Sequence, residues 1–143
     1  MDWGVIASCA TAIGVAFAAW EIRQGWKLSQ TEFEDSLDQQ YRSLSMVIPV
    51  DALIGKAIAS EKRNIAREAI YNYLDLSNEQ IFLRKRGRIQ KDTWDDWCSG
   101  IESHLTKVAF KEVWDEVKKE APSTFSFLEK LEIKGFKDDP INW

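Results

Sequence analysis

The chain has 143 residues, a formal net charge of −4 and an isoelectric point near 5.1, and 29% of its residues are charged. This length suits one modest domain with a short additional segment, and the acidic balance supplies no overall field that would attract nucleic acid or anionic lipid. Two cysteines are too few for a disulfide framework, so the composition suits a reducing compartment.

The first segment, residues 3–20, holds eighteen consecutive residues without a charge. As a helix it would extend about 27 Å, close to the hydrocarbon thickness of a bilayer. Trp3 and Trp20 stand at its ends, where the indole ring suits the headgroup level. The first cations follow it, so the positive-inside rule predicts an outside N-terminus and a cytoplasmic body. We therefore expect residues 1–21 to form a transmembrane anchor.

The composition of this segment leaves two alternatives open. It contains six alanines and no leucine, so an Ala-rich helix buried inside a soluble oligomer fits the same residues. A cleaved signal peptide is the other alternative, because residues 16–18 (Ala-Phe-Ala) are similar to a cleavage site. That alternative lacks the basic N-terminal region, since Asp2 stands where a cation is expected.

Small residues recur every four positions along the same segment. Such rows let two helix backbones approach closely, which is a common way for membrane spans to associate. We therefore expect the chain to form a homo-oligomer whose spans meet through Gly4, Ser8, Ala12 and Ala16. The alternative is that an Ala-rich helix contains these rows by chance.

Apolar residues keep a helical spacing after the uncharged segment. Their intervals of three, four and seven residues mark one stripe on a helix. Residues 22–48 are therefore predicted to continue the first helix as a juxtamembrane helix, which Pro49 ends. The stripe could bury against the body of its own chain or against another copy. It consists of Ile22, Trp26, Phe33, Leu37, Tyr41, Leu44 and Ile48.

Residues 49–135 are predicted to form a helical cytoplasmic body. Asp51 suits the N-cap of a short helix over residues 52–59. Ser60 suits the N-cap of a longer helix over residues 61–86, which has a broad apolar face.

Residues 75–78 contain Asp, Ser and Asn, and we expect them to break or kink the longer helix. Gly87 is suited to the position just after its C-terminal end. Asp92 with Asp95 is predicted to begin the next helix, and the helix after that is expected to end at Pro122.

Ser123 is predicted to cap a last helix that ends at Gly135. The tail, residues 136–143, is expected to be irregular. No run of alternating residues is long enough for a strand, so the fold class is all-α. We expect a long N-terminal transmembrane helix that continues into a cytoplasmic helical bundle.

Residues 66–101 resemble an uncharacterised family of small bacterial membrane-anchored all-helical proteins. A second patch, containing Phe110, Trp114, Phe125 and Leu128, is similar to the closing helices of that family. The resemblance implies a bacterial protein in the inner membrane, and it implies no activity or functional residue. The matching positions are Arg67, Ile70, Leu74, Gly87, Ile89, Trp94 and Trp97.

The densest group of cations follows the longer helix. Clustered cations offer several charge-assisted contacts, so we consider them a candidate contact for a phosphate or a lipid headgroup. A solvated helix end explains the same residues, and long nucleic acid is disfavoured because no aromatic residues alternate with the cations. The group consists of Arg84, Lys85, Arg86, Arg88 and Lys91.

We find no pattern typical of catalysis. His104 and Cys98 are six residues apart, which is about 240° around a helix, so they do not share a face. No second Cys or His completes a set with metal-ligand spacing, and adjacent carboxylates such as Asp95 and Asp96 point apart on a helix. We therefore expect no enzyme activity and no cofactor.

These observations favour a single-pass membrane-anchored helical module for interaction or sensing, in bacterial defence or stress signalling. Its expected partners are the membrane, other copies of the chain and a further protein. One alternative is a ligand-gated membrane effector whose spans cluster into a pore. The other is a soluble helical binding protein.

Overall fold

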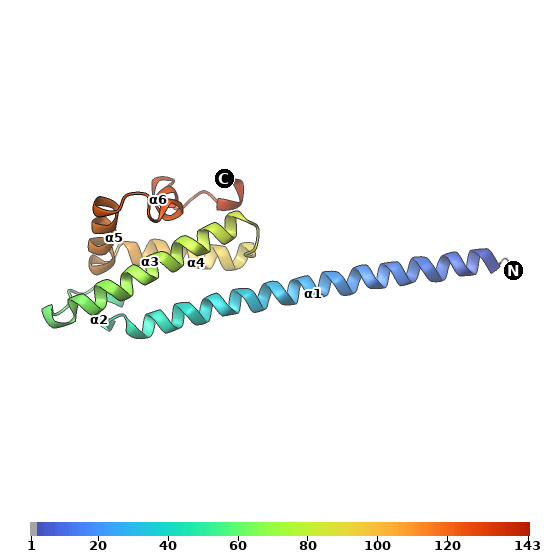
Figure 1. Cartoon of the computed structure of the whole chain (residues 1–143), viewed down its shortest axis with the longest axis horizontal. Coiled ribbons are helices and arrows are strands. Elements are labelled where there is room, and N and C mark those ends of the chain that lie inside the picture. Colours follow the sequence, from blue (N-terminus) through green and yellow to red (C-terminus); the bar gives the residue numbers. More distant parts are fainter. Residues whose placement is uncertain (1–2) are drawn as a thin grey trace. The chain divides into compact units, whose positions relative to one another are not determined.

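A computed structural model describes the backbone of residues 3–143 and the side chains of residues 13–143. Helix accounts for 79% of the chain, and residues 3–143 contain no strand, so the predicted all-α fold is confirmed. Figure 1 shows the elements in chain order. They are α1 (Trp3–Val47), α2 (Val50–Leu53), the 3₁₀ turn η1 (Ser60–Lys62), α3 (Arg63–Lys85), α4 (Lys91–Leu105), α5 (Val108–Glu120), α6 (Ser126–Ile133) and the 3₁₀ turn η2 (Pro140–Asn142).

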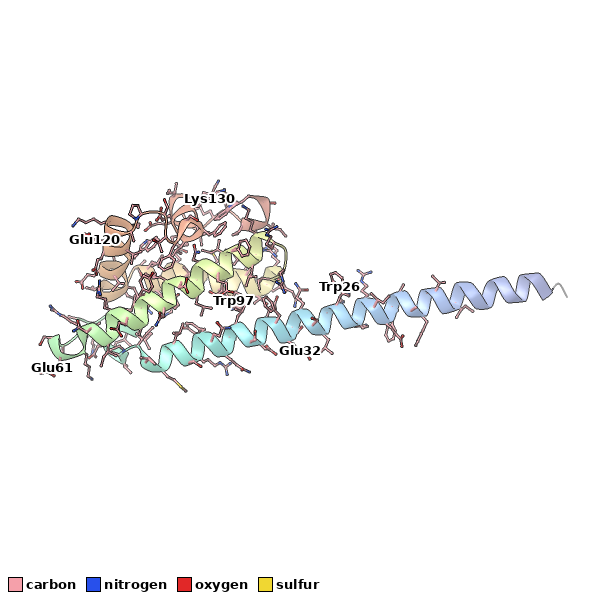
Figure 2. The ribbon with its side chains drawn as sticks, viewed as in Figure 1. Trp26, Glu32, Glu61, Trp97, Glu120 and Lys130 are labelled. Carbon is pink, nitrogen blue, oxygen red and sulfur yellow. The ribbon has the colours of Figure 1, made fainter. Side chains whose placement is uncertain are left out.

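The chain divides into two compact units, one up to Asp35 and one over Ser36–Trp143. The first unit is the greater part of α1, which continues without a break through the boundary between the units. Large apolar side chains are exposed along it, and Trp26 reaches 77% (Figure 2). The exposed set includes Ile13, Val15, Phe17, Trp20, Ile22, Trp26 and Leu28.

The predicted transmembrane span is not supported by the residues whose side chains are described. Among these residues no helix combines the length and the apolar character needed to cross a bilayer. The physical reason is charge. A stretch of eighteen residues that starts at Ile13 contains Glu21, Arg23 and Lys27. Residues 3–12 of the predicted span lie outside this set of side chains.

Three of the four residues predicted for self-association also lie outside the described side chains. Gly4, Ser8 and Ala12 lie outside the described side chains, and Ala16 is exposed. Their role in association stays a prediction.

In the second unit α3 is the central helix, and it contacts α5, α6 and η2 (Figure 1). The first turns of α3 bury small residues, Ala66 and Ala69, and the later turns bury larger aliphatic ones. On α5 the residues Phe110 and Trp114 are almost fully buried, one turn apart. The four-residue spacing of apolar side chains on both helices thus produces the core of this unit.

The C-terminal part of α1, from Ser36 onward, belongs to the core of the second unit. Leu37 is 2% exposed, and the ring of Tyr41 lies 6.1 Å from the ring of Tyr73. Trp97 on α4 donates its indole N–H to Asp38 Oδ1 over 2.9 Å (Figure 2). The C-terminal part of the apolar stripe therefore packs within its own chain.

The expected break at residues 75–78 is wrong, because α3 is continuous there. The hydroxyl of the buried Ser77 donates to the carbonyl of Tyr73 at 2.9 Å, so this polar group is satisfied while the residue stays helical. Asn78 Oδ1 accepts the backbone N–H groups of Phe127 and Leu128, at 3.0 and 3.1 Å. Asn78 therefore caps α6 from another helix, and α3 needs no kink to use it.

The expected cap at Ser123 is also wrong. Ser123 has a positive φ of 66°, and its backbone N–H donates to Glu129 Oε1 over 2.9 Å. The helix begins only at Ser126.

Two short segments differ from their predicted form. The helix expected over residues 52–59 is the four-residue α2, and Gly55 then takes a φ of 79°, which a residue with a side chain rarely adopts. The tail expected to be irregular contains η2, in which Pro140 is buried. The Asp139 carboxylate accepts the N–H of Ile141 and caps this turn.

Candidate functional site

Arg84, the first residue of the predicted phosphate contact, is buried, and its guanidinium is hydrogen-bonded within the chain. Its Nε donates to Asp139 Oδ1 over 2.8 Å, and its Nη2 bonds the second carboxylate oxygen. Its Nη1 donates to the carbonyl of Ile89, also over 2.8 Å. The hydrogen bond raises the pKa of Arg84 and lowers the pKa of Asp139. Arg84 thus holds the end of α3, the following turn and the tail together.

The remaining cations of that group have other neighbours. Lys91 donates to Asp95 over 2.6 Å, one turn along α4. The Lys85 ammonium lies 5.4 Å from the centre of the Phe127 ring, and Arg86 lies 5.3 Å from that of Phe82. Arg88 is exposed. Lys85, Arg86 and Lys91 thus each contact a different residue. The phosphate contact stays a prediction.

His104 lies in an aromatic cluster in which four helices meet. Its ring centre is 5.0 Å from those of Tyr73 on α3 and Phe110 on α5, and 6.3 Å from that of Tyr41 on α1. Its Nδ1 is 2.7 Å from the carbonyl of Gly100. Burial lowers the pKa of the imidazole, so the folded state favours the neutral ring.

We expect His104 to make the stability of the body depend on pH. Because its pKa in the folded state is below 6.5, its contribution is present above pH 6.5 and decreases as the pH falls below that value. The free energy of unfolding should therefore decrease from pH 7 to pH 5, and less so in the His104→Phe variant. Urea unfolding of both proteins at the two pH values measures the difference. Parallel pH profiles would show that His104 does not titrate on unfolding.

Cys98 is buried, and its thiol donates to the carbonyl of Phe136 at 3.6 Å. Burial raises the pKa of the thiol to about 11, so the nucleophilic thiolate is disfavoured at neutral pH. Among the described side chains no three His, Cys, Asp or Glu residues form a group that could hold a metal ion.

A groove between α3 and α5 was not predicted from the sequence. One hollow of about 190 Å³ and another of about 410 Å³ lie along it, and Arg67, Val113 and Glu116 line both. Arg67 Nε donates to Glu116 Oε2 over 3.0 Å, and a second bond joins Nη2 to Oε1. This bond raises the pKa of Arg67 and lowers the pKa of Glu116. The bidentate pair therefore links the two helices where the hollows meet.

The sequence does carry a signal for this groove. Arg63 precedes Arg67 by four residues, and Glu112 precedes Glu116 by four. Four-residue spacing places each pair on one face of its helix, which sequence analysis can recognise. It could not recognise that the two faces lie opposite each other, because that depends on how α3 packs on α5.

Comparisons with protein-family models, curated proteins and solved structures gave no match. The resemblance to a family of membrane-anchored helical proteins therefore stays a prediction.

Proposed function

We propose that this chain is a single-pass membrane-anchored helical protein whose body is an interaction or sensing module. The observation that carries the proposal is the uncharged run of residues 3–20 within a helix that continues unbroken to Val47. Eighteen uncharged residues suit the hydrocarbon thickness. One continuous helix would then connect the anchor with the core of the body.

The exposed apolar side chains on α1 support the proposal that lipid or another chain, and not water alone, surrounds this helix. Ile13, Phe17, Trp20 and Trp26 are each more than half exposed. Large exposed apolar side chains in one segment are typical of a contact with lipid or with another chain. Lipid around the first part of the helix, and other copies of the chain beside it, would both cover such surface.

The charges that follow the run give the proposed orientation. Arg23 and Lys27 lie directly after it, whereas Asp2 is the only charged side chain before it. The positive-inside rule then favours a cytoplasmic body and an outside N-terminus, in the bacterial inner membrane if the family resemblance holds.

An arginine in the middle of the run is expected to release the chain from the membrane. Thr11→Arg places a charge at the centre of the proposed span, where insertion costs about 3 kcal/mol. Gln24→Arg is the matched control, because it adds the same charge outside the run. Fractionation of cells should find the parent chain and Gln24→Arg with the membranes, and Thr11→Arg depleted from them. Recovery of the parent chain as a water-soluble protein would contradict the anchor.

Self-association is tested on the detergent-extracted chain by measuring its mass in solution. We expect a species heavier than one copy, because the small-residue row lets spans approach closely. Ala16→Leu, which widens the row, should reduce that mass, and a monomer in the parent chain would contradict association.

A further inference from the structure

The smaller hollow between α3 and α5 has an apolar floor. Ala66 and Ile70 supply it from α3, and Ala109 and Val113 supply it from α5. All four are less than a tenth exposed. A volume of about 190 Å³ is open beside these side chains.

The two sides of this hollow carry opposite charge. Arg63 and Arg67 contribute two guanidinium groups from α3, and Glu112 and Glu116 contribute two carboxylates from α5. Because each pair is separated by one helical turn, both of its members line the same side. The hollow therefore has one positive side, one negative side and an apolar floor.

The two opposite pairs differ in one respect. Arg67 and Glu116 satisfy each other through their bidentate bond. Arg63 and Glu112 stand one turn earlier on their helices and line the same hollow, yet neither side chain has a hydrogen bond or ion pair within the described part of the chain. The second hollow is lined by later residues of both helices, among them Tyr71 and Asn72 on α3 and Val117 on α5.

We propose that this hollow binds a small zwitterion, a free amino acid with an aliphatic side chain. Its carboxylate accepts hydrogen bonds from Arg63, its ammonium donates to Glu112, and its side chain lies on the apolar floor. A ligand with one charge would leave the opposite side unmatched, whereas a zwitterion forms charge-assisted hydrogen bonds with both. This assignment names a ligand for the sensing role proposed above and rests on that role for its biological meaning.

The test is isothermal titration of the detergent-solubilised full-length chain with L-leucine. We expect saturable binding at one site. Leucinamide lacks the carboxylate and 4-methylpentanoate lacks the ammonium, so each should bind at least about tenfold more weakly. Phosphoethanolamine, which carries the charges of a zwitterionic lipid headgroup without an aliphatic side chain, should also bind more weakly.

Variants locate the binding in the hollow. Arg63→Gln and Glu112→Gln should each weaken leucine binding about tenfold, because each removes one charged partner. Both residues are exposed, so the fold is expected to tolerate the changes, and the urea midpoint of each variant checks this. Glu120→Gln is the matched control at the other end of α5 (Figure 2) and should bind leucine like the parent chain.

Three results would overturn the inference: no saturable binding of leucine, unchanged affinity in both variants, or binding of phosphoethanolamine without binding of leucine. Each is distinct from a failure of the anchor, which membrane fractionation measures. A chain that binds leucine but fractionates with soluble proteins would refute the anchor alone.

Discussion

Replacing Arg84 with alanine is expected to lower the free energy of unfolding of the body by about 3 kcal/mol. The side chain is 7% exposed and bonds two oxygens of Asp139 and the carbonyl of Ile89. Its removal leaves a partly buried carboxylate and a backbone carbonyl without their donor, which costs more than the bonds themselves contribute. Urea unfolding followed by circular dichroism measures the loss.

Arg86→Ala is the matched control for this change. Arg86 is two residues away in the same basic group, but it is exposed and only lies over the ring of Phe82 at 5.3 Å. Its loss should cost less than about 1 kcal/mol, the size of an exposed cation–π contact. Equal losses in the two variants would show that the bond to Asp139 does not hold the tail to α3.

Replacing Phe110 with alanine is expected to cost about 3–5 kcal/mol, a large share of the stability of a domain of this size. Phe110 has no exposed surface, and its ring centre lies 5.3 Å from that of Tyr73 and 5.0 Å from that of His104. Truncation removes a ring from the cluster in which α1, α3, α4 and α5 meet, and the surrounding structure relaxes only partly into the cavity left behind. The midpoint of thermal or urea unfolding should decrease strongly.

Ile133→Ala provides the comparison for Phe110→Ala. Ile133 is also a large apolar residue of the body, but it is 85% exposed at the end of α6. Its truncation should change the free energy of unfolding by no more than about 0.5 kcal/mol. If Phe110→Ala is no more harmful than Ile133→Ala, the aromatic cluster does not contribute to the core as described.

Periodic apolar residues made most of the helices predictable. The stripe through Leu37, Tyr41 and Ile48 predicted that the first helix continues to the residues before Pro49, and α1 ends at Val47. Such a pattern is local, since it needs only the 3.6-residue period of the helix and the preference of apolar side chains for the interior. The helix order and the all-α class follow from the same information.

Features that depend on distant residues could not be predicted in this way. Asn78 was expected to disturb its own helix, whereas its side chain caps α6. Arg84 was grouped with neighbouring cations, whereas its partner Asp139 lies 55 residues away. In both cases the polar group is satisfied by tertiary packing, and a local pattern contains no information about that partner. The α3–α5 groove was missed for the same reason.

The place of the last turns of α1 within the core sets a rule for dissecting this protein. A fragment that starts at Pro49, where the sequence suggests a natural cut, would lack Leu37, Tyr41 and Ile48. It would also lose the Asp38 oxygen that accepts the indole N–H of Trp97. A fragment for crystallisation or binding studies should therefore begin no later than Ser36. A shorter one would expose Tyr73, Trp97 and His104, which contact α1, and is expected to aggregate.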